Sequence, residues 1–167
     1  LVWFYETTGD SQALELADRF ATYHLEHSTH PDGTFNSDSN PGHTHSYLGT
    51  LRGLLLFGLL TKQRKYVEAV AATYNVTVRK LTVKESGWTS HNIDTDIADG
   101  RGQDRSAEVT SPGDAAQIAM WLGLDAGYPE FLDDVERIVR ARILPSQITE
   151  LPDVQLPSGL DRDQEDK

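Results

Sequence analysis

Residues 43–60 form a long apolar segment that limits what this chain can fold into. The segment reads HTHSYLGTLRGLLLFGLL, and its leucines recur at helical spacing. Such a wide apolar face predicts an inner helix, one that other helices cover on most sides. The leucines on this face are Leu48, Leu51, Leu54, Leu55 and Leu59.

The segments on either side predict narrower, amphipathic helices. Gly9 ends a first helix over residues 1–8, and Asp10 is a suitable N-cap for a helix that runs to about His27. The inward face expected there is Ala13, Leu16, Ala17, Phe20 and either Tyr23 or His24. A second outer helix is predicted over 64–81, with Tyr66, Val67, Val70, Ala71, Tyr74 and Val78 on its apolar side.

Two further helices are predicted beyond a second polar loop. Residues 112–124 give a compact apolar helix and residues 129–143 an amphipathic one, whose apolar side is Phe131, Leu132, Val135, Ile138 and Val139. The loops over 28–42 and 84–113 are rich in turn-forming residues. The acidic residues 151–167 have too little apolar material to bury, which predicts a linker or a disordered tail after a domain over 1–150.

The starts of the outer helices recur along the chain. TGDSQAL at 8–14, TKQRKYV at 61–67 and AGYPEFL at 126–132 mark helical hairpins separated by long loops at the same end. This recurrence predicts an all-α fold, an α/α toroid of hairpins, and the chain supplies about three of the six that close such a ring. The remaining half would come from a missing segment or a second chain.

The charge narrows the range of partners. The net charge is −11 at pH 7, which disfavours binding to nucleic acid and to anionic membrane surfaces. No apolar run is long enough to span a membrane, so a soluble protein is expected. Cysteine is absent, which excludes thiolate metal sites but leaves the compartment open, with a cytoplasmic location favoured over export.

Polar residues of the two long loops converge at the start of the inner helices. His43 and His45 precede or open one inner helix, while Asp104, Glu108 and Asp114 precede or open the next. A pair of carboxyl groups can cleave a glycosidic bond when one of them donates a proton and the other stays ionised. The sequence therefore predicts Glu108, Asp114 and Asp104 as catalytic candidates.

The substrate-binding candidates are His43, His45, Arg52, Trp88 and Arg105, with an oligosaccharide or polysaccharide as the expected ligand. Trp88 offers a ring on which a sugar could stack. Simpler structural roles are open for these residues. The role of Asp114 could simply be to stabilise the helix through a favourable interaction with its dipole, and Arg52 could be a buried ion-pair partner.

No metal or cofactor is predicted. The acidic segment from Asp94 fails the EF-hand pattern, because position 6 is Asp99 and position 12 is Arg105, although a looser calcium site stays open. An isolated H-x-H pair is a weak metal signal. Phosphate loops, G-x-S-x-G and H-E-x-x-H are absent from the sequence.

Four segments together resemble a known group of proteins. GHTHSYLGTLRGLL, KYVEAV, RSAEVTSPGDAAQIAMWLG and GYPEFLDDVERIVRARILPSQ are similar to the six-hairpin carbohydrate-active proteins, in particular the β-L-arabinofuranosidase-like group and its uncharacterised relatives. The resemblance implies an (α/α)6 barrel that hydrolyses glycosides at the mouths of its inner helices. It implies a sugar contact for His43 and a catalytic segment around Glu108 or Asp114.

The chain departs from that group in one respect. The characterised arabinofuranosidases use a zinc-bound cysteine as nucleophile, and this chain has no cysteine. We therefore expect a glycoside hydrolase that uses carboxylates. Two alternatives are a non-catalytic helical-repeat module that binds oligosaccharide or protein, and a polysaccharide lyase in which His43 acts with Arg52 or Arg105.

Overall fold

The protein is all-α in the part of the chain that the structure describes. The computed structural model describes residues 1–39, 42–82, 85–93 and 109–147. In these ranges the chain forms helices, and its only β-type pairings are isolated bridges such as Thr29 with Phe35 and Thr82 with Thr89. The predicted fold class is confirmed at this level.

The first hairpin begins as the sequence predicts. Helix α1 spans Val2–Thr8 and ends at Gly9, which adopts a left-handed conformation with φ of 72°. Helix α2 spans Ser11–His27, and the Asp10 carboxylate accepts a 2.8 Å hydrogen bond from the backbone N–H of Gln12. The glycine and the N-cap therefore set the turn between the two helices.

The second hairpin pairs the apolar helix with a long outer one. Helix α3 spans Thr44–Thr61. The outer helix runs from residue 64 to residue 81 as α4 (Arg64–Thr73), the π-helical η2 (Tyr74–Val78) and α5 (Arg79–Leu81). The helix predicted over 64–81 is thus present, but the sequence analysis did not predict its π-helical segment.

The third hairpin has the same organisation. Helix α7 spans Thr110–Leu124 and begins two residues before the predicted start. The outer helix follows as η3 (Pro129–Phe131), α8 (Leu132–Ile138) and the π-helical η4 (Val139–Ile143). A short 3-10 helix, η1, lies at Ser37–Ser39 in the first long loop.

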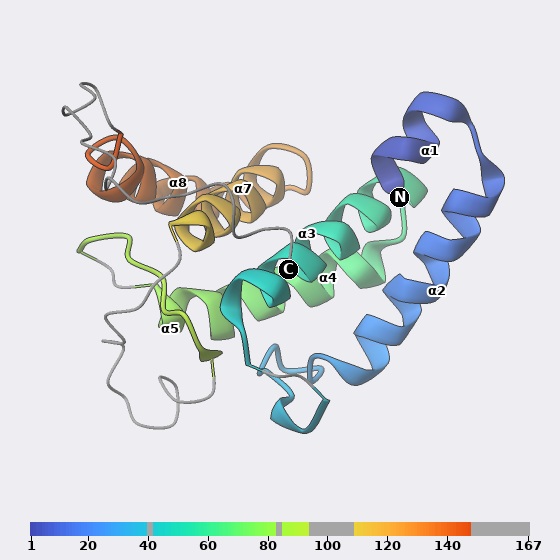
Figure 1. The fold of residues 1–167 in the computed structure, drawn as a ribbon, viewed down its shortest axis with the longest axis horizontal. Helices are drawn as coiled ribbons and strands as arrows, with labels where there is room; N and C mark the ends of the chain where they lie inside the picture. The colour runs from blue at the N-terminus through green and yellow to red at the C-terminus, as the bar shows by residue number, and fades with distance from the viewer. Residues whose placement is uncertain (40–41, 83–84, 94–108, 148–167) are drawn as a thin grey trace, which may run out of the picture.

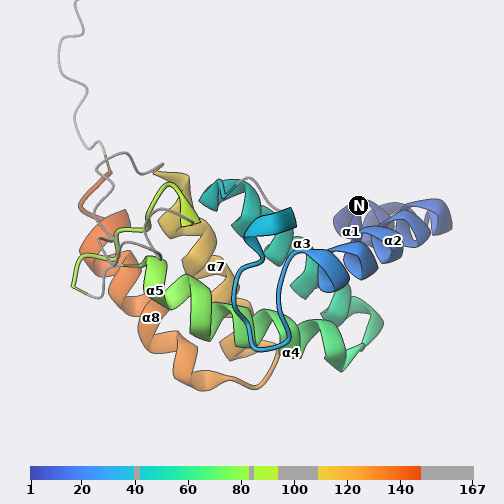
Figure 2. The same ribbon diagram turned by 90° about the horizontal axis from the view of Figure 1, so that it is seen from below.

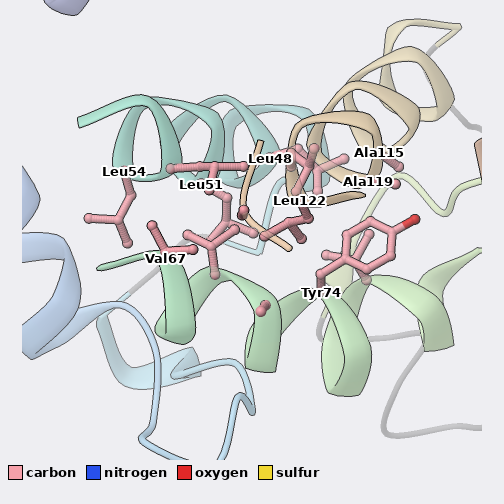
Figure 3. Close-up of a cluster of buried hydrophobic side chains, with 14 of the residues drawn as sticks. Leu48, Leu51, Leu54, Val67, Tyr74, Ala115, Ala119 and Leu122 are labelled. Carbon is pink, nitrogen blue, oxygen red and sulfur yellow. The ribbon is translucent and has the colours of Figure 1, made fainter. Parts of the chain in front are cut away.

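The three hairpins lie in sequence order, with α3 and α4 between the α1/α2 pair and the α7/α8 pair (Figures 1 and 2). Helix α3 contacts α1, α2, α4 and α7, which agrees with the inner position predicted from its leucines. Its side chains meet those of α4 and α7 in one apolar core (Figure 3). The fully buried members include Leu48, Leu51, Leu55, Tyr66, Val70, Val78, Ala115, Ile118, Ala119, Leu122 and Ile138.

The π-helical segments repeat along the chain. Tyr74–Val78 and Val139–Ile143 begin 65 residues apart, each near the end of an outer helix. The same interval separates the starts of the two outer helices at Arg64 and Pro129. The two outer helices therefore each have a π-helical segment at the same distance from their start.

One part of the predicted core is wrong. The sequence places Phe20 and either Tyr23 or His24 on the inward face of α2, but in the structure Phe20 is 61% exposed, and of the other two His24 is buried while Tyr23 is 62% exposed. The buried positions are Ala13, Ala17, Ala21 and His24, which share one helical face. The small residues of this face let α2 approach α3 closely, and the aromatic residues lie outside it.

Candidate functional site

A buried carboxylate joins the N-terminal parts of two inner helices. Asp114 lies in the second turn of α7, and its side chain is 8% exposed. Its Oδ2 lies 2.6 Å from Nδ1 of His45 in the first turn of α3, and its Oδ1 accepts a 2.6 Å hydrogen bond from Nη1 of Arg52. His45 and Arg52 are seven residues apart, which places them on one face of α3.

This arrangement favours one tautomer of neutral His45. Because a carboxylate can only accept hydrogen bonds, the neutral ring that fits this contact carries its proton on Nδ1 and leaves Nε2 as the acceptor. The His45 side chain is 41% exposed, whereas Arg52 is 26% exposed. Asp114 thus orients an accessible imidazole, and Arg52 balances the negative charge of Asp114.

Two further histidines lie beside His45. The ring centroid of His43 is 6.2 Å from that of His45 and 4.9 Å from that of His91. His43 is the N-cap residue of α3, and its Nδ1 lies 2.7 Å from Oγ of Ser46. Three imidazoles therefore gather at the start of α3, and we refer to His43, His45 and His91 as the histidine cluster.

His91 comes from the second long loop, which is tied to the start of α3 by backbone hydrogen bonds. The N–H of Thr44 donates to the carbonyl of His91 at 2.9 Å, and the N–H of Ile93 donates to the carbonyl of Gly42 at 2.8 Å. The sequence analysis missed His91, because nothing in its local sequence indicates this pairing.

An aromatic ring lies beside the guanidinium of Arg52. The guanidinium of Arg52 lies 5.9 Å from the ring centroid of Trp121 on α7. Trp121 is partly buried and packs against the core. Nε of Arg52 is buried and has no hydrogen-bond partner, so the Arg52 side chain is held by Asp114 and by the packing around it.

The structure brings together His43, His45, Arg52 and Asp114 from the predicted set. Trp88 has another partner in the structure, since the guanidinium of Arg142 lies 4.2 Å from its ring centroid. Asp104, Arg105 and Glu108 lie outside the described residues, as does the whole acidic segment from Asp94 that was weighed as a calcium site.

In the described ranges, no set of three or more His, Asp or Glu side chains could hold a metal ion. Among the same residues, no helix combines the length and the apolar character that crossing a membrane requires.

Comparisons with family models, with curated proteins and with solved structures gave no match to this chain. A function for the chain is therefore inferred from the arrangement of the site.

Proposed function

We propose that the histidine cluster, with Arg52 and Asp114, is the saccharide site of a carbohydrate-active enzyme that cleaves glycosidic bonds. The observation that carries this proposal is the bridging of His45 and Arg52 by Asp114, at 2.6 Å to each. A carboxylate that orients an accessible imidazole is a common arrangement for general acid–base catalysis. His45 is the residue that exchanges a proton with the substrate.

Asp114 takes a different role from the one that its sequence position first suggests. Both of its oxygen atoms have partners and its side chain is 8% exposed, so it acts through His45 as a positioning residue. Hydrolysis then needs a second group that stabilises the developing positive charge or activates water. Glu108 and Asp104 are the proposed sources of that carboxylate.

Arg52 favours a second candidate reaction, elimination from a uronic acid residue. In this reaction His45 removes the proton next to the sugar carboxylate, and the glycosidic oxygen takes a proton from water and leaves the adjacent carbon as a hydroxyl group while a carbon–carbon double bond forms. A cation near the base stabilises the intermediate charge, and Arg52 lies on the same helix face as His45. The two reactions give different products, because only elimination leaves an unsaturated sugar that absorbs ultraviolet light.

We propose the toroid as the architecture around this site. The hairpin repeat, its matching π-helical segments and the contacts of α3 with both α1 and α7 support it. Large exposed apolar side chains at both ends of the array, such as Phe4 on α1 and Leu144 after η4, support coverage by further hairpins. These hairpins would come from another segment or a second chain.

The test of the function is a substrate screen followed by substitution of His45. A panel of neutral and acidic oligosaccharides is assayed for new reducing ends and for unsaturated products. For the best substrate, His45→Gln should lower kcat/KM by about 10²–10⁴-fold. The control is His30→Gln, at a histidine of the first long loop outside the histidine cluster, which should change it less than twofold.

The same assay separates enzyme from binding module. If His45→Gln cleaves the best substrate as fast as the wild type, His45 does not carry the chemistry and the proposal is wrong. If oligosaccharides bind with no product formed by the wild type, the protein is a binding module instead.

A further inference from the structure

An apolar groove lies between α3 and the α1/α2 pair, and on α3 its lining begins at Gly49, four residues after His45. It has a volume of about 410 Å³ and is lined by residues of α1, α2 and α3, among them Trp3, Phe20, Gly49, Gly53 and Leu56. A cavity of this size lies within the range of small-molecule sites, roughly 300–1,000 Å³. Two of its large apolar side chains, Trp3 and Phe20, are 56% and 61% exposed, so the groove presents apolar surface to a ligand.

The floor of the groove shares a helix face with His45. Gly49 lies four residues after His45 and Gly53 four residues further, and residues at this spacing lie one above another along a helix. No heavy atom lies within 4 Å of the position that a Cβ would take at either glycine. The missing side chains therefore leave open space that begins one helical turn from the proposed proton-transfer residue.

The polar residues of the groove favour an uncharged ligand. Arg52 lines it, but its charge is balanced by Asp114. His24 also lines it and is 4% exposed, and burial lowers its pKa from 6.5 to about 4, so the imidazole is neutral at pH 7. Nε2 of His24 is buried and has no hydrogen-bond partner, so the groove has an uncharged polar atom in its wall.

We propose that this groove receives the apolar, uncharged aglycone of a glycoside whose sugar is held at the histidine cluster. The inference rests on the proposed function and narrows its substrate class to glycosides with an aryl or similar apolar aglycone. Two features support it: Gly49, which lines the groove, lies one helical turn from His45, and Arg52, which also lines it, shares Asp114 with His45. Placing the aglycone in the groove would bring the glycosidic oxygen toward His45.

The first experiment uses 4-ethylphenol as an aglycone probe, titrated into the protein and followed by NMR or calorimetry. We expect saturable binding with one site, and weaker binding of 4-ethylbenzoate, which carries the same body with a charge. Gly53→Leu should weaken binding of 4-ethylphenol at least tenfold, since the new side chain occupies the groove. It should not unfold the protein, because leucine favours a helix over glycine and meets no atom there.

The matched control is Gly113→Leu. Gly113 is also a helical glycine with open space at its Cβ, but it does not line the groove. This variant should bind 4-ethylphenol as the wild type does. No saturable binding by the wild type, equal binding by Gly53→Leu, or tighter binding of 4-ethylbenzoate than of 4-ethylphenol would each overturn the proposal.

The second experiment compares the 4-nitrophenyl and methyl glycosides of the best sugar. The aryl glycoside should have a KM at least fivefold lower, and Gly53→Leu should remove this difference with little change in kcat. Loss of turnover in His45→Gln with no KM effect of Gly53→Leu would reject the groove and keep the proposed function. Wild-type turnover in His45→Gln would reject the function, whatever binds in the groove.

Self-association is a competing explanation for the groove, and sedimentation distinguishes it. If the wild type is a dimer and Gly53→Leu is a monomer, the groove is an interface between copies of this chain. That result would also overturn the aglycone proposal.

Discussion

Oδ2 of Asp114 accepts a 2.6 Å hydrogen bond from Nδ1 of His45, although the two residues are 69 positions apart in the chain. The bond joins the start of α3 to the start of α7. Arg52, on the same face of α3, donates a hydrogen bond to the other oxygen of Asp114. One contact thus links two hairpins and orients the exposed imidazole of the candidate site.

Asp114→Asn should both destabilise the protein and disturb the site. The substitution leaves the Arg52 guanidinium without its counter-ion, and removing one partner of a buried pair costs about 3–5 kcal/mol. Because Arg52 is 26% exposed, we expect a smaller loss, about 2–3 kcal/mol, in the free energy of unfolding measured with urea.

A second buried carboxylate provides the control for this prediction. Asp134 accepts a 2.7 Å hydrogen bond from Nε of Arg79 and is also bonded to Arg137, far from the histidine cluster in sequence. Asp134→Asn should lower stability by a similar amount and leave turnover of any substrate intact. Equal loss of turnover in both variants, measured well below their melting temperatures, would mean that Asp114 acts only through stability.

The sequence predicts the helices well because their signals are local. Gly9, the Asp10 cap and the leucine spacing of α3 each act within a few residues, and the corresponding helix ends agree with them. The prediction for Phe20 is wrong, and His24 rather than Tyr23 is the buried alternative, because two apolar faces of α2 compete. Which of the two faces packs against α3 depends on the size of the side chains at the contact. The helical periodicity of the sequence carries no information on how side-chain size decides this contact.

The candidate site is less predictable because it depends on contacts between distant segments. The positions of His45 and Asp114 at helix starts indicate a site, but their pairing depends on how α3 packs against α7. His91 carries no local signal at all, since its place is set by backbone bonds to Thr44. The chemistry of Trp88 suits a sugar contact, and only the fold reveals its contact with Arg142.

The N-cap of α2 gives a local test of the first hairpin. Asp10→Ala removes the 2.8 Å hydrogen bond to the N–H of Gln12, and loss of such a cap costs about 1 kcal/mol. Asp10→Ser keeps a side-chain oxygen that can cap the helix, so its urea midpoint should stay close to that of the wild type. A midpoint for Asp10→Ser as low as that of Asp10→Ala would show that the negative charge, rather than the cap, stabilises α2.

His24 should make stability depend on pH between about 4 and 6.5. Burial lowers its folded-state pKa from 6.5 to about 4, so in this range the unfolded chain binds the proton more tightly than the folded protein does. The contribution of neutral His24 to the free energy of unfolding is fully present above pH 6.5 and is lost as the pH falls toward 4. A shift of this size corresponds to about 3 kcal/mol.

The measurement is the free energy of unfolding of the wild type and of His24→Phe across this range. Phenylalanine keeps an aromatic ring beside Tyr47, whose centroid lies 5.8 Å from that of His24, and it cannot titrate. The difference between the two proteins should therefore change with pH, although other groups titrate in both. Parallel curves would show that His24 is not neutral and buried in the folded protein.

Gly33 and Gly53 should respond in opposite directions to the same substitution. Gly33 has φ of +84°, and a Cβ there would lie 2.4 Å from the carbonyl oxygen of Ala72 on α4, while its own carbonyl accepts a 2.7 Å hydrogen bond from Thr77. Gly33→Ala should lower the free energy of unfolding by at least about 2 kcal/mol, because both the left-handed backbone and the backbone contact oppose a side chain. Gly53→Ala meets no atom and should raise it by about 0.5–1 kcal/mol, the helix propensity difference. Urea unfolding of the two variants tests the pair, and a Gly33→Ala protein as stable as the wild type would mean that the first long loop is not held against α4 in solution.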